Sequence, residues 1–325
     1  MNIPPETYIR VAATDLGDFC RRLGRAAGLP AARADLLADL LIANDLRGVM
    51  SHGTQQLATY ARLLRDGRLN ALSAVATVQE TPTSLLVDGD GGLGYFPAYD
   101  GTQRVIDKAL ASGIAVLVTR NHGHFGAAGL YSRLTLSHDL LCFVTSGHQL
   151  HLKPGDQVYA AAGGSPMSFS APTAEEPPLV LDFGAMHDLY DGSSRDLLAE
   201  VAPGLVHRSI GMGMVCQSWG GLLAGVPIDP SRTERRWPGA NQGSMVVAMR
   251  IDLFIDPATF KAEMDEYART VRTLVPVPGS SGSYLPGGPE AAKETTYLAD
   301  GIPVGAEHRQ LLEDIAAEFT ITVPW

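Results

Sequence analysis

Apolar residues recur three and four positions apart near the start of the chain, a spacing that places them on one face of a helix. The pattern predicts a first helix that Thr14 caps and that ends before Gly28, with an apolar face made of Leu16, Phe19, Cys20 and Leu23. A second helix is predicted over 30–44, where leucines occupy positions 36, 37, 40 and 41. Helical spacing resumes at about Gln55, after the unusual segment DLRGVMSHG.

The middle and end of the chain alternate short apolar runs with longer runs of helical spacing. A strand and turn are predicted over 83–95, and strands over 114–119, 140–145, 179–183, 244–252 and 319–323. Helices are predicted over 97–112, 127–137, 208–225, 257–274 and 308–318. Because the runs at 114–119 and 140–145 flank a helix, they predict a parallel crossover unit. Segments rich in glycine, proline and small residues predict loops over 154–178 and 276–289.

A chain of 325 residues, 45% of them hydrophobic and 18% charged, has enough apolar material for a sizeable core and the length of about two domains. We expect a helical domain built from 1–80 and 257–325, which contains both chain ends, and a central α/β domain over 81–256. The net charge of -10 disfavours nucleic acid and anionic membrane surfaces as partners. It still permits a local basic pocket for an anionic small molecule.

The three cysteines are far apart and odd in number, which indicates no disulfide framework and favours a reducing compartment. The first residues lack the basic and apolar segments of a signal peptide. No apolar run reaches the ~18 residues that a membrane helix needs. We therefore expect a cytoplasmic protein that acts on a small molecule and has no membrane partner.

The glycine-rich segment GDGGLG at 89–94 is the nearest approach to a nucleotide-binding motif. A dinucleotide fingerprint needs GxGxxG between a strand and a helix. Because helical spacing begins only at Pro97, these glycines favour a turn over a phosphate loop. The chain also contains no GxxxxGK[ST], no HExxH and no GxSxG.

Two histidines lie beside glycines at the ends of predicted elements, where a substrate can approach the backbone closely. His52 stands in Ser51-His52-Gly53 before a helix, and the alternative there is a packed histidine beside a capping serine. His124 stands in NHGHFG at the end of the 114–119 strand, where α/β proteins place ligands, and the alternative is a surface turn. We expect both imidazoles to face one pocket, with at least one of them transferring a proton.

His122 and Asp182 are the remaining candidates. His122 and His124 form an HxH pair that suits a metal, but the spacing supplies no further ligand, so we expect no metal. Asp182 ends the apolar run LVLD. It is either a cap for the next segment or a site residue that orients an imidazole and raises its basicity.

These segments, in this order and at this spacing, resemble the type-2 malate/L-lactate dehydrogenase family, which includes ureidoglycolate dehydrogenase, diketogulonate reductase, sulfolactate dehydrogenase and Δ1-piperideine-2-carboxylate reductase. The resemblance runs from about Tyr8 to Val323 and is strongest in DLRGVMSHG at 45–53, VDGDGGLG at 87–94 and NHGHFGAAGLY at 121–131. It is weaker in LDFG at 181–184, HRSIGMGM at 207–214, NQGS at 241–244 and LPGGPE at 285–290.

The resemblance implies a non-Rossmann α/β fold with a mixed sheet, and a homodimer. It also implies hydride transfer between NAD(P)H and the C=O or C=N bond of a 2-keto acid, a cyclic imino acid or a related carbonyl compound. By the same resemblance, His52 and His124 act as proton donor or acceptor, and Asp182 lies beside the nicotinamide. Ser51, Gln56 and Arg47 are then expected at the substrate, and the expected cofactor positions are Ser146, Asp182, Phe183, Gly184, His207, Arg208, Gly211 and Gly287.

The chain departs from the family pattern at both ligands. The family has an arginine that grips the substrate carboxylate in a bidentate fork, and this chain has Gln56. We therefore expect an uncharged substrate, or a carboxylate held by Arg47, Arg62 or another cation. The segment over 184–205 is clearly shorter than in the family, so we expect weak NAD(P)H binding. Arg208, expected to begin the helix over 208–225, favours a phosphate and hence NADPH.

Three functions stay open. The leading one is an NAD(P)-dependent oxidoreductase. The runner-up keeps the fold and the histidines but has lost the nucleotide, and is a non-redox acid/base enzyme of a specialised biosynthetic pathway, such as an isomerase, cyclase or lyase. The third is a catalytically silent member that binds or scaffolds, against which the joint presence of Ser51, His52, His124 and Asp182 argues.

Overall fold

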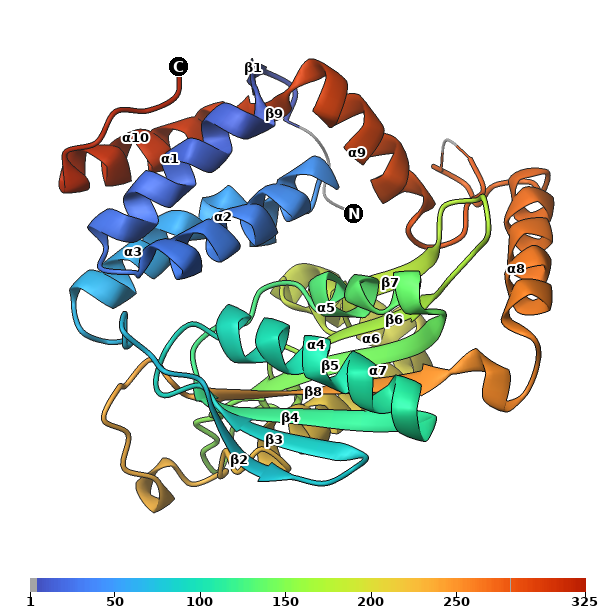
Figure 1. Ribbon diagram of the computed structural model, residues 1–325, viewed down its shortest axis with the longest axis horizontal. Helices are drawn as coiled ribbons and strands as arrows, with labels where there is room; N and C mark the ends of the chain where they lie inside the picture. Colours follow the sequence, from blue (N-terminus) through green and yellow to red (C-terminus); the bar gives the residue numbers. More distant parts are fainter. Residues whose placement is uncertain (1–4, 281) are drawn as a thin grey trace. The chain divides into compact units, whose positions relative to one another are not determined.

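The computed structural model describes residues 5–280 and 282–325. Contacts divide the chain into two compact units, which we call the terminal unit (Met1–Ser73 with Gly287–Trp325) and the sheet unit (Ala74–Pro286). The sequence placed the two boundaries at residues 80 and 257 instead. Each unit is described by itself, and its elements are labelled in Figure 1.

The terminal unit combines helices from both ends of the chain with one small sheet (Figure 1). Its elements are β1 (Tyr8–Val11), α1 (Ala13–Ala26), α2 (Ala31–Leu46), α3 (Leu57–Arg65), α9 (Gly288–Asp300), β9 (Ile302–Gly305) and α10 (Ala306–Phe319). Strands β1 and β9 pair antiparallel, from Tyr8 opposite Gly305 to Val11 opposite Ile302. The apolar face predicted for the first helix is confirmed, because Leu16, Phe19, Cys20 and Leu23 are all buried.

Three predictions for this unit are wrong. Thr14 is not the cap of α1, since Ala12 takes that position without a side-chain hydrogen bond. The strand expected over 319–323 does not form, because α10 continues to Phe319 and Thr320 then adopts the left-handed conformation. Helix α9 was missed because its first residues look like loop. Pro289 is nevertheless tolerated in the first turn, where its missing N–H has no helical partner.

The sheet unit is built on seven strands in the order β2-β3-β4-β8-β5-β6-β7. Their bounds are β2 (Ala76–Glu80), β3 (Ser84–Asp88), β4 (Ile114–His122), β5 (Leu140–His148), β6 (Pro166–Ala171), β7 (Leu179–Gly184) and β8 (Gln242–Arg250). Of the strand pairs that the structure describes, β3–β4 is parallel and the others are antiparallel. The mixed α/β sheet confirms the expected fold class.

The predicted parallel crossover is wrong in one respect. Strands β4 and β5 run in the same direction, but β8 lies between them and pairs antiparallel with both. The parallel neighbours are β3 and β4, which α4 (Tyr95–Ser112) connects. Sequence spacing could not reveal this, because the strand that separates β4 from β5 comes almost a hundred residues after β5.

Helices cover both faces of this sheet (Figure 1). On the α4 face lie α4 and α5 (Gly129–Leu134). Gly101 of α4 packs directly on Leu117, and Ser132 of α5 bonds Ser168 of β6. On the α7 face lie α7 (Pro203–Cys216) and a π-helical turn, Gln217–Leu222. Trp219 of this turn contacts Phe143 of β5 edge-on, with ring centroids 5.9 Å apart.

Helix α8 (Pro257–Arg272) explains why the unit boundary differs from the sequence-based one. Its buried Asp265 accepts hydrogen bonds from the backbone N–H groups of Ala174, Glu175 and Glu176, in the connection between β6 and β7. A carboxylate that caps three backbone donors ties the helix to the sheet. Nothing in the hydrophobic pattern of 257–274 signals this polar anchor.

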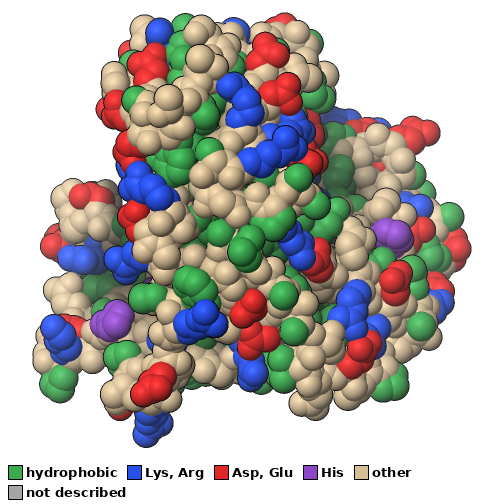
Figure 2. Space-filling model, turned by 60° about the vertical axis from the view of Figure 1, so that its left-hand side comes forward, with side chains coloured by type: hydrophobic (Ala, Val, Ile, Leu, Met, Phe, Trp, Pro, Cys, Tyr) green, Lys and Arg blue, Asp and Glu red, His purple; other side chains and the backbone are tan. Residues whose placement is uncertain are grey.

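Surface charge and helix composition bear on partners. On the face shown in Figure 2, basic and acidic side chains lie intermixed. Several of them form ion pairs, such as Arg62 and Arg65 with Glu318. In the part of the chain that the structure describes, no helix is both long enough and apolar enough to cross a bilayer.

Candidate active site

His52 closes a 3-10 turn, Met50–His52, that follows α2 in the terminal unit. Its Nδ1 atom lies 3.0 Å from Oγ of Ser51, so the serine hydroxyl orients the ring. Its backbone carbonyl accepts a 2.8 Å hydrogen bond from Nδ2 of Asn44, at the end of α2. The imidazole is partly exposed, which leaves a face for a ligand.

A buried polar network lies under this turn and was not found from the sequence. Asp45 is fully buried, and its Oδ2 accepts hydrogen bonds from N (3.0 Å) and Oγ1 (2.6 Å) of Thr54. Oγ1 of Thr54 also lies 3.0 Å from Nε2 of His308, on α10. Burial raises the pKa of Asp45 to about 7, against the opposing hydrogen bonds from Thr54. Burial lowers the pKa of His308 to about 4.

The two residues expected to hold the substrate have partners inside the terminal unit. Gln56 donates from Nε2 to the carbonyl of Ser51 at 2.8 Å, so it braces the turn that carries His52. Arg47 makes a bidentate ion pair with Glu294, at 2.9 and 3.2 Å. Arg62, the other named cation, pairs in the same way with Glu318. A substrate carboxylate would have to displace these partners.

His124 lies in a turn of the sheet unit that follows β4. Its backbone carbonyl accepts a 3.0 Å hydrogen bond from the N–H of Gly94, and Gly92 accepts a 2.8 Å bond from Gly123. The glycine-rich segment 89–94 therefore pairs with the histidine turn, backbone to backbone. A Cβ on Gly94 would lie 2.5 Å from the carbonyl oxygen of Gly123. These glycines serve close packing, in agreement with the prediction of a turn.

The rest of this turn is fixed by aromatic side chains. Gly126 has φ = 83°, and a Cβ there would lie 2.5 Å from the ring of Tyr95. The hydroxyl of Tyr131 donates to the carbonyl of Phe125, and the two rings stack. The turn is thus held on both sides of His124, whose side chain is partly exposed.

His122 is a structural residue. It is fully buried, with Nε2 2.7 Å from Oγ1 of Thr119 and Nδ1 2.7 Å from the carbonyl oxygen of Gly123. Burial lowers its pKa to about 4. Because both ring nitrogens have protein partners, neither is available to a metal. Among the described residues, no three His, Cys, Asp or Glu side chains gather as metal ligands do.

Asp182 and Ser146 share the α4 face of the sheet. The strand register places Ser168 opposite Asp182, and Ser168 bonds Ser132 of α5. A Cβ on Gly129, at the start of α5, would lie 2.5 Å from Oδ2 of Asp182. The carboxylate therefore lies against the segment that follows His124 in sequence. Side chains alternate along a strand, so Phe183 points to the opposite, α7 face.

The shortened segment folds back on the turn Gly163-Gly164-Ser165-Pro166. Backbone N–H groups of Ala185 and Met186 donate to the carbonyl (3.0 Å) and hydroxyl (3.0 Å) oxygens of Ser165. The hydroxyl of Tyr190 donates to the carbonyl of Gly164 at 3.1 Å. Gly184 thus leads directly into a tight connection, which continues as α6 (Gly192–Val201).

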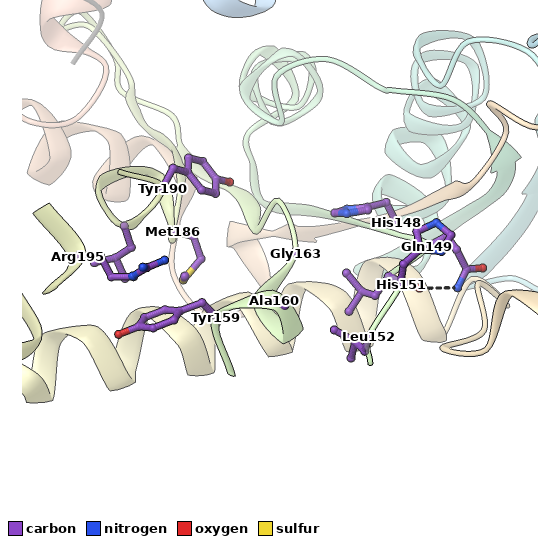
Figure 3. A pocket seen from close by; sticks show the side chains of 12 residues that line it. His148, Gln149, His151, Leu152, Tyr159, Ala160, Gly163, Met186, Tyr190 and Arg195 are labelled. Carbon is purple, nitrogen blue, oxygen red and sulfur yellow. Dashed lines mark hydrogen bonds between the residues drawn. The ribbon is translucent and has the colours of Figure 1, made fainter. Parts of the chain in front are cut away.

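A cavity of about 400 Å³ opens where this segment, the 148–152 segment and the Gly163 turn meet (Figure 3). At one end, the guanidinium of Arg195 lies 4.7 Å from the ring centroid of Tyr159, with Tyr190 close by. At the other end lie His148 and His151. Burial and the neighbouring His151 lower the pKa of His148. Of the described residues that line the cavity, none carries a carboxylate.

The expected positions on α7 do not join this cluster. The helix begins at Pro203, so Arg208 is not at its start and the argument for a free helix N-terminus there is wrong. Arg208 donates instead from Nε to the carbonyl of Gly204 at 2.8 Å. With Val206 and Ile210 buried, His207, Arg208 and Gly211 point outward on the α7 face. Gly287, the last expected position, caps α9 in the terminal unit with φ = 97°.

Comparisons with known proteins extend over the whole chain. It is 25% identical to a malate dehydrogenase of Pyrococcus horikoshii over 344 aligned positions, which cover 95% of this chain and 94% of the relative. It is 23% identical to ureidoglycolate dehydrogenase (NAD(+)) of Escherichia coli K12, over 86% of this chain and 87% of the relative. A solved structure of the Pyrococcus horikoshii malate dehydrogenase has the same fold, with a TM-score of 0.86, 24% identity and 99% of each chain covered. The relatives and the fold define an α/β enzyme of the dehydrogenase class.

A family model described as malate/L-lactate dehydrogenase matches residues 11–186 and 192–313. The chain therefore belongs to the malate/L-lactate dehydrogenase family, as its sequence motifs predicted. It is an NAD(P)-dependent oxidoreductase. The match breaks at 187–191, inside the segment recognised as shortened.

Proposed function

We propose that this protein transfers a hydride between NAD(P)H and the C=O or C=N bond of a small 2-keto acid, cyclic imino acid or related carbonyl compound, with histidine as the proton donor or acceptor. The observation that carries the proposal is the family match across both histidine turns and the Asp182 strand. The particular substrate class and the histidine role are our inference.

In this proposal His52 and His124 are the acid/base residues and Asp182 is the third member of the set. Each imidazole is partly exposed on a turn whose backbone is held rigidly, as a proton donor requires. During reduction one of them gives its proton to the substrate oxygen or nitrogen, and during oxidation it takes the proton back. Ser51 orients His52 through Nδ1, which leaves Nε2 for the substrate.

The residues of the sheet unit fit a nicotinamide cofactor. When bound, the nicotinamide supplies or accepts the hydride at its C4. Ser146 and Asp182 share one sheet face, and Gly184 leads into the cavity wall. The cavity offers Arg195 and two imidazoles to phosphate, and tyrosine rings to a base. We retain Ser146, Asp182, Phe183, Gly184 and Gly287 as cofactor positions and leave out the outward His207, Arg208 and Gly211.

Cofactor binding is proposed to be weak. The shortened segment and Gly288 remove family contacts, each worth about 0.5–1.5 kcal/mol. Three or four such losses turn a micromolar dissociation constant into one of roughly a millimolar. The preference for NADPH rested on Arg208 at a helix start, and the observed start at Pro203 removes that argument.

One observation favours the non-redox alternative. The cofactor segment is the part of the chain where the family match breaks, whereas both histidine turns lie inside the match. A chain that lost the nucleotide would keep His52, His124 and Asp182 as an acid/base set, for an isomerase, cyclase or lyase reaction.

Titration of NADH and NADPH fluorescence with the purified protein tests the proposal, together with turnover of pyruvate, oxaloacetate and a cyclic imino acid. We expect saturable binding and turnover of at least one of these compounds. The absence of binding at millimolar concentrations of both nucleotides would contradict the redox proposal and favour the alternative.

We also propose a homodimer that works in the cytoplasm. The outward side of α7 and the π-helical turn exposes Leu205 (53%), Val215 (42%) and Trp219 (48%), an apolar surface that a second copy would cover. The three cysteines are free and buried, as suits a reducing compartment. Light scattering should give twice the 34.5 kDa of the chain, and a monomer at micromolar concentration would contradict the dimer.

A further inference from the structure

The network of Asp45, Thr54 and His308 has no part in the chemistry proposed above, yet it lies directly under the turn that carries His52. Asp45 is the last residue but one of α2, and His308 belongs to the first turn of α10. Thr54, two residues after His52, joins them through its backbone N–H and its hydroxyl. All three side chains are buried.

The hydrogen bonds of Thr54 have a defined direction. Its hydroxyl has one hydrogen and lies 2.6 Å from Oδ2 of Asp45 and 3.0 Å from Nε2 of His308. When Asp45 is ionised, the hydroxyl donates to the carboxylate and must accept from Nε2–H of His308. The tautomer of His308 is therefore set by Thr54, and three elements of the terminal unit are linked through one hydroxyl.

The same network fixes the residue next to His52. A Cβ on Gly53 would lie 1.7 Å from Oδ1 of Asp45, so the carboxylate occupies the space that a side chain would need. Oδ1 is buried and has no hydrogen-bond partner among the described residues. On the other side, Asn44 holds the carbonyl of His52. The turn is thus clamped at His52 and at Thr54, with Gly53 pressed against Asp45.

We propose that Asp45, Thr54 and His308 are positioning residues that hold the His52 turn, and hence the His52 imidazole, in the orientation needed for proton transfer. This inference rests on the proposed function of His52. An unpaired buried carboxylate oxygen is costly, and a site that needs a precisely held imidazole gives a reason for its presence. A mere packing role would be met by apolar side chains of similar shape.

Thr54→Val is the principal test, because valine keeps the branched shape and removes the hydroxyl. Thr54→Ser keeps the hydroxyl and should restore function. Thr102→Val is a matched control, since Thr102 is equally buried and its hydroxyl bonds the carbonyl of Ala98 within α4. We expect Thr54→Val to lower kcat/KM by about 10- to 100-fold, as a misplaced catalytic group does, and the other two variants to stay close to wild type.

A second measurement does not depend on turnover. The rate at which diethylpyrocarbonate modifies His52, followed by peptide mapping, reports the orientation and exposure of that imidazole. We expect this rate to change in Thr54→Val but not in Thr54→Ser or Thr102→Val. If the wild type turns over none of the carbonyl substrates, the proposed function fails, while the modification rate still decides the positioning role.

Wild-type kcat/KM and wild-type His52 reactivity in a folded Thr54→Val variant would overturn the proposal. If Thr54→Val does not fold, His308→Phe and His308→Gln repeat the comparison from the other end of the network. Glutamine keeps an N–H donor toward Thr54 and phenylalanine does not. Equal His52 reactivity in these two variants would overturn the proposal as well.

Discussion

The two histidine turns solve one problem by different means. His52 and His124 each precede or follow a glycine, and each imidazole is partly exposed. The His52 turn is held by side chains: Asn44, Asp45 and Thr54 supply its hydrogen bonds. The His124 turn is held by backbone bonds to the 89–94 segment.

The difference predicts different weaknesses. Backbone bonds do not titrate, so the His124 turn depends on the absence of side chains at its glycines. The His52 turn depends on ionisable buried groups, whose contribution changes with pH. Substitution and pH therefore separate the two designs.

The largest effect is expected from His124→Ala. Loss of a placed proton-transfer group should lower kcat by ~10²–10⁴-fold, while the fold is retained because the turn is held by its backbone. His138→Ala is the matched control, since His138 is an exposed histidine in a 3-10 turn of the same unit. Steady-state kinetics with circular dichroism check this, and an unchanged kcat would remove His124 from the mechanism.

Stability should fall as pH falls. His122 and His308 have pKa values lowered from 6.5 to about 4, so the unfolded chain binds their protons first and each contributes about 3 kcal/mol of stability that is lost between pH 6.5 and 4. Asp45 acts in the opposite direction, because its pKa is raised from 3.8 to about 7. One histidine is thereby offset, and the net loss is about 3 kcal/mol.

Asp45→Asn sharpens this prediction. The amide does not titrate, so both histidines act unopposed and the slope of stability against pH should be about twice as steep between pH 4 and 6.5. Urea unfolding at several pH values measures both slopes. Equal slopes in the two proteins would mean that Asp45 is already ionised in this range.

A smaller effect, on stability, is expected at Gly94. A Cβ there would lie 2.5 Å from the carbonyl oxygen of Gly123, so Gly94→Ala should cost about 1–3 kcal/mol through overpacking. Gly211→Ala is the control, because that helical glycine has open space around it and alanine should stabilise α7 by up to about 1 kcal/mol. Thermal unfolding compares them, and equal effects would contradict close packing at the His124 turn.

The smallest effect is expected from Gln56→Arg. An arginine fork contributes about 1–2 kcal/mol more to a carboxylate than a neutral amide does, so kcat/KM for pyruvate should rise by roughly 5- to 30-fold. The variant loses the bond from Gln56 to Ser51, which limits the gain. No gain in a folded variant would mean that another cation holds the carboxylate.

Much of the fold was readable from local pattern. The helix faces of α1 and α2, the strand before His124 and the strand ending at Asp182 follow from spacing that neighbouring residues enforce. Strands β1, β2, β6 and β9 were missed. They are short, and their pairing depends on partners that the local sequence does not contain.

The site was readable as far as its motifs extend. His52, His124 and Asp182 were found because they stand beside glycines or end an apolar run. Asp45 and Thr54 lie within or next to the same DLRGVMSHG motif but looked like ordinary helix-end residues, and His308 is more than 250 positions away. The error at Arg208 has a similar cause, since the helix start at Pro203 is set by tertiary packing of Val206 and Ile210.

The order of the sheet also governs when this protein can fold during synthesis. Strand β8, near the C-terminal end of the sheet unit, lies at the centre of the sheet between β4 and β5. Until residue 250 has left the ribosome, β4 and β5 have no bridge, and β1 waits still longer for its partner β9. Contacts between such distant residues make folding slow. The nascent chain therefore carries unpaired apolar strands for most of its synthesis, which makes it a natural client for chaperones.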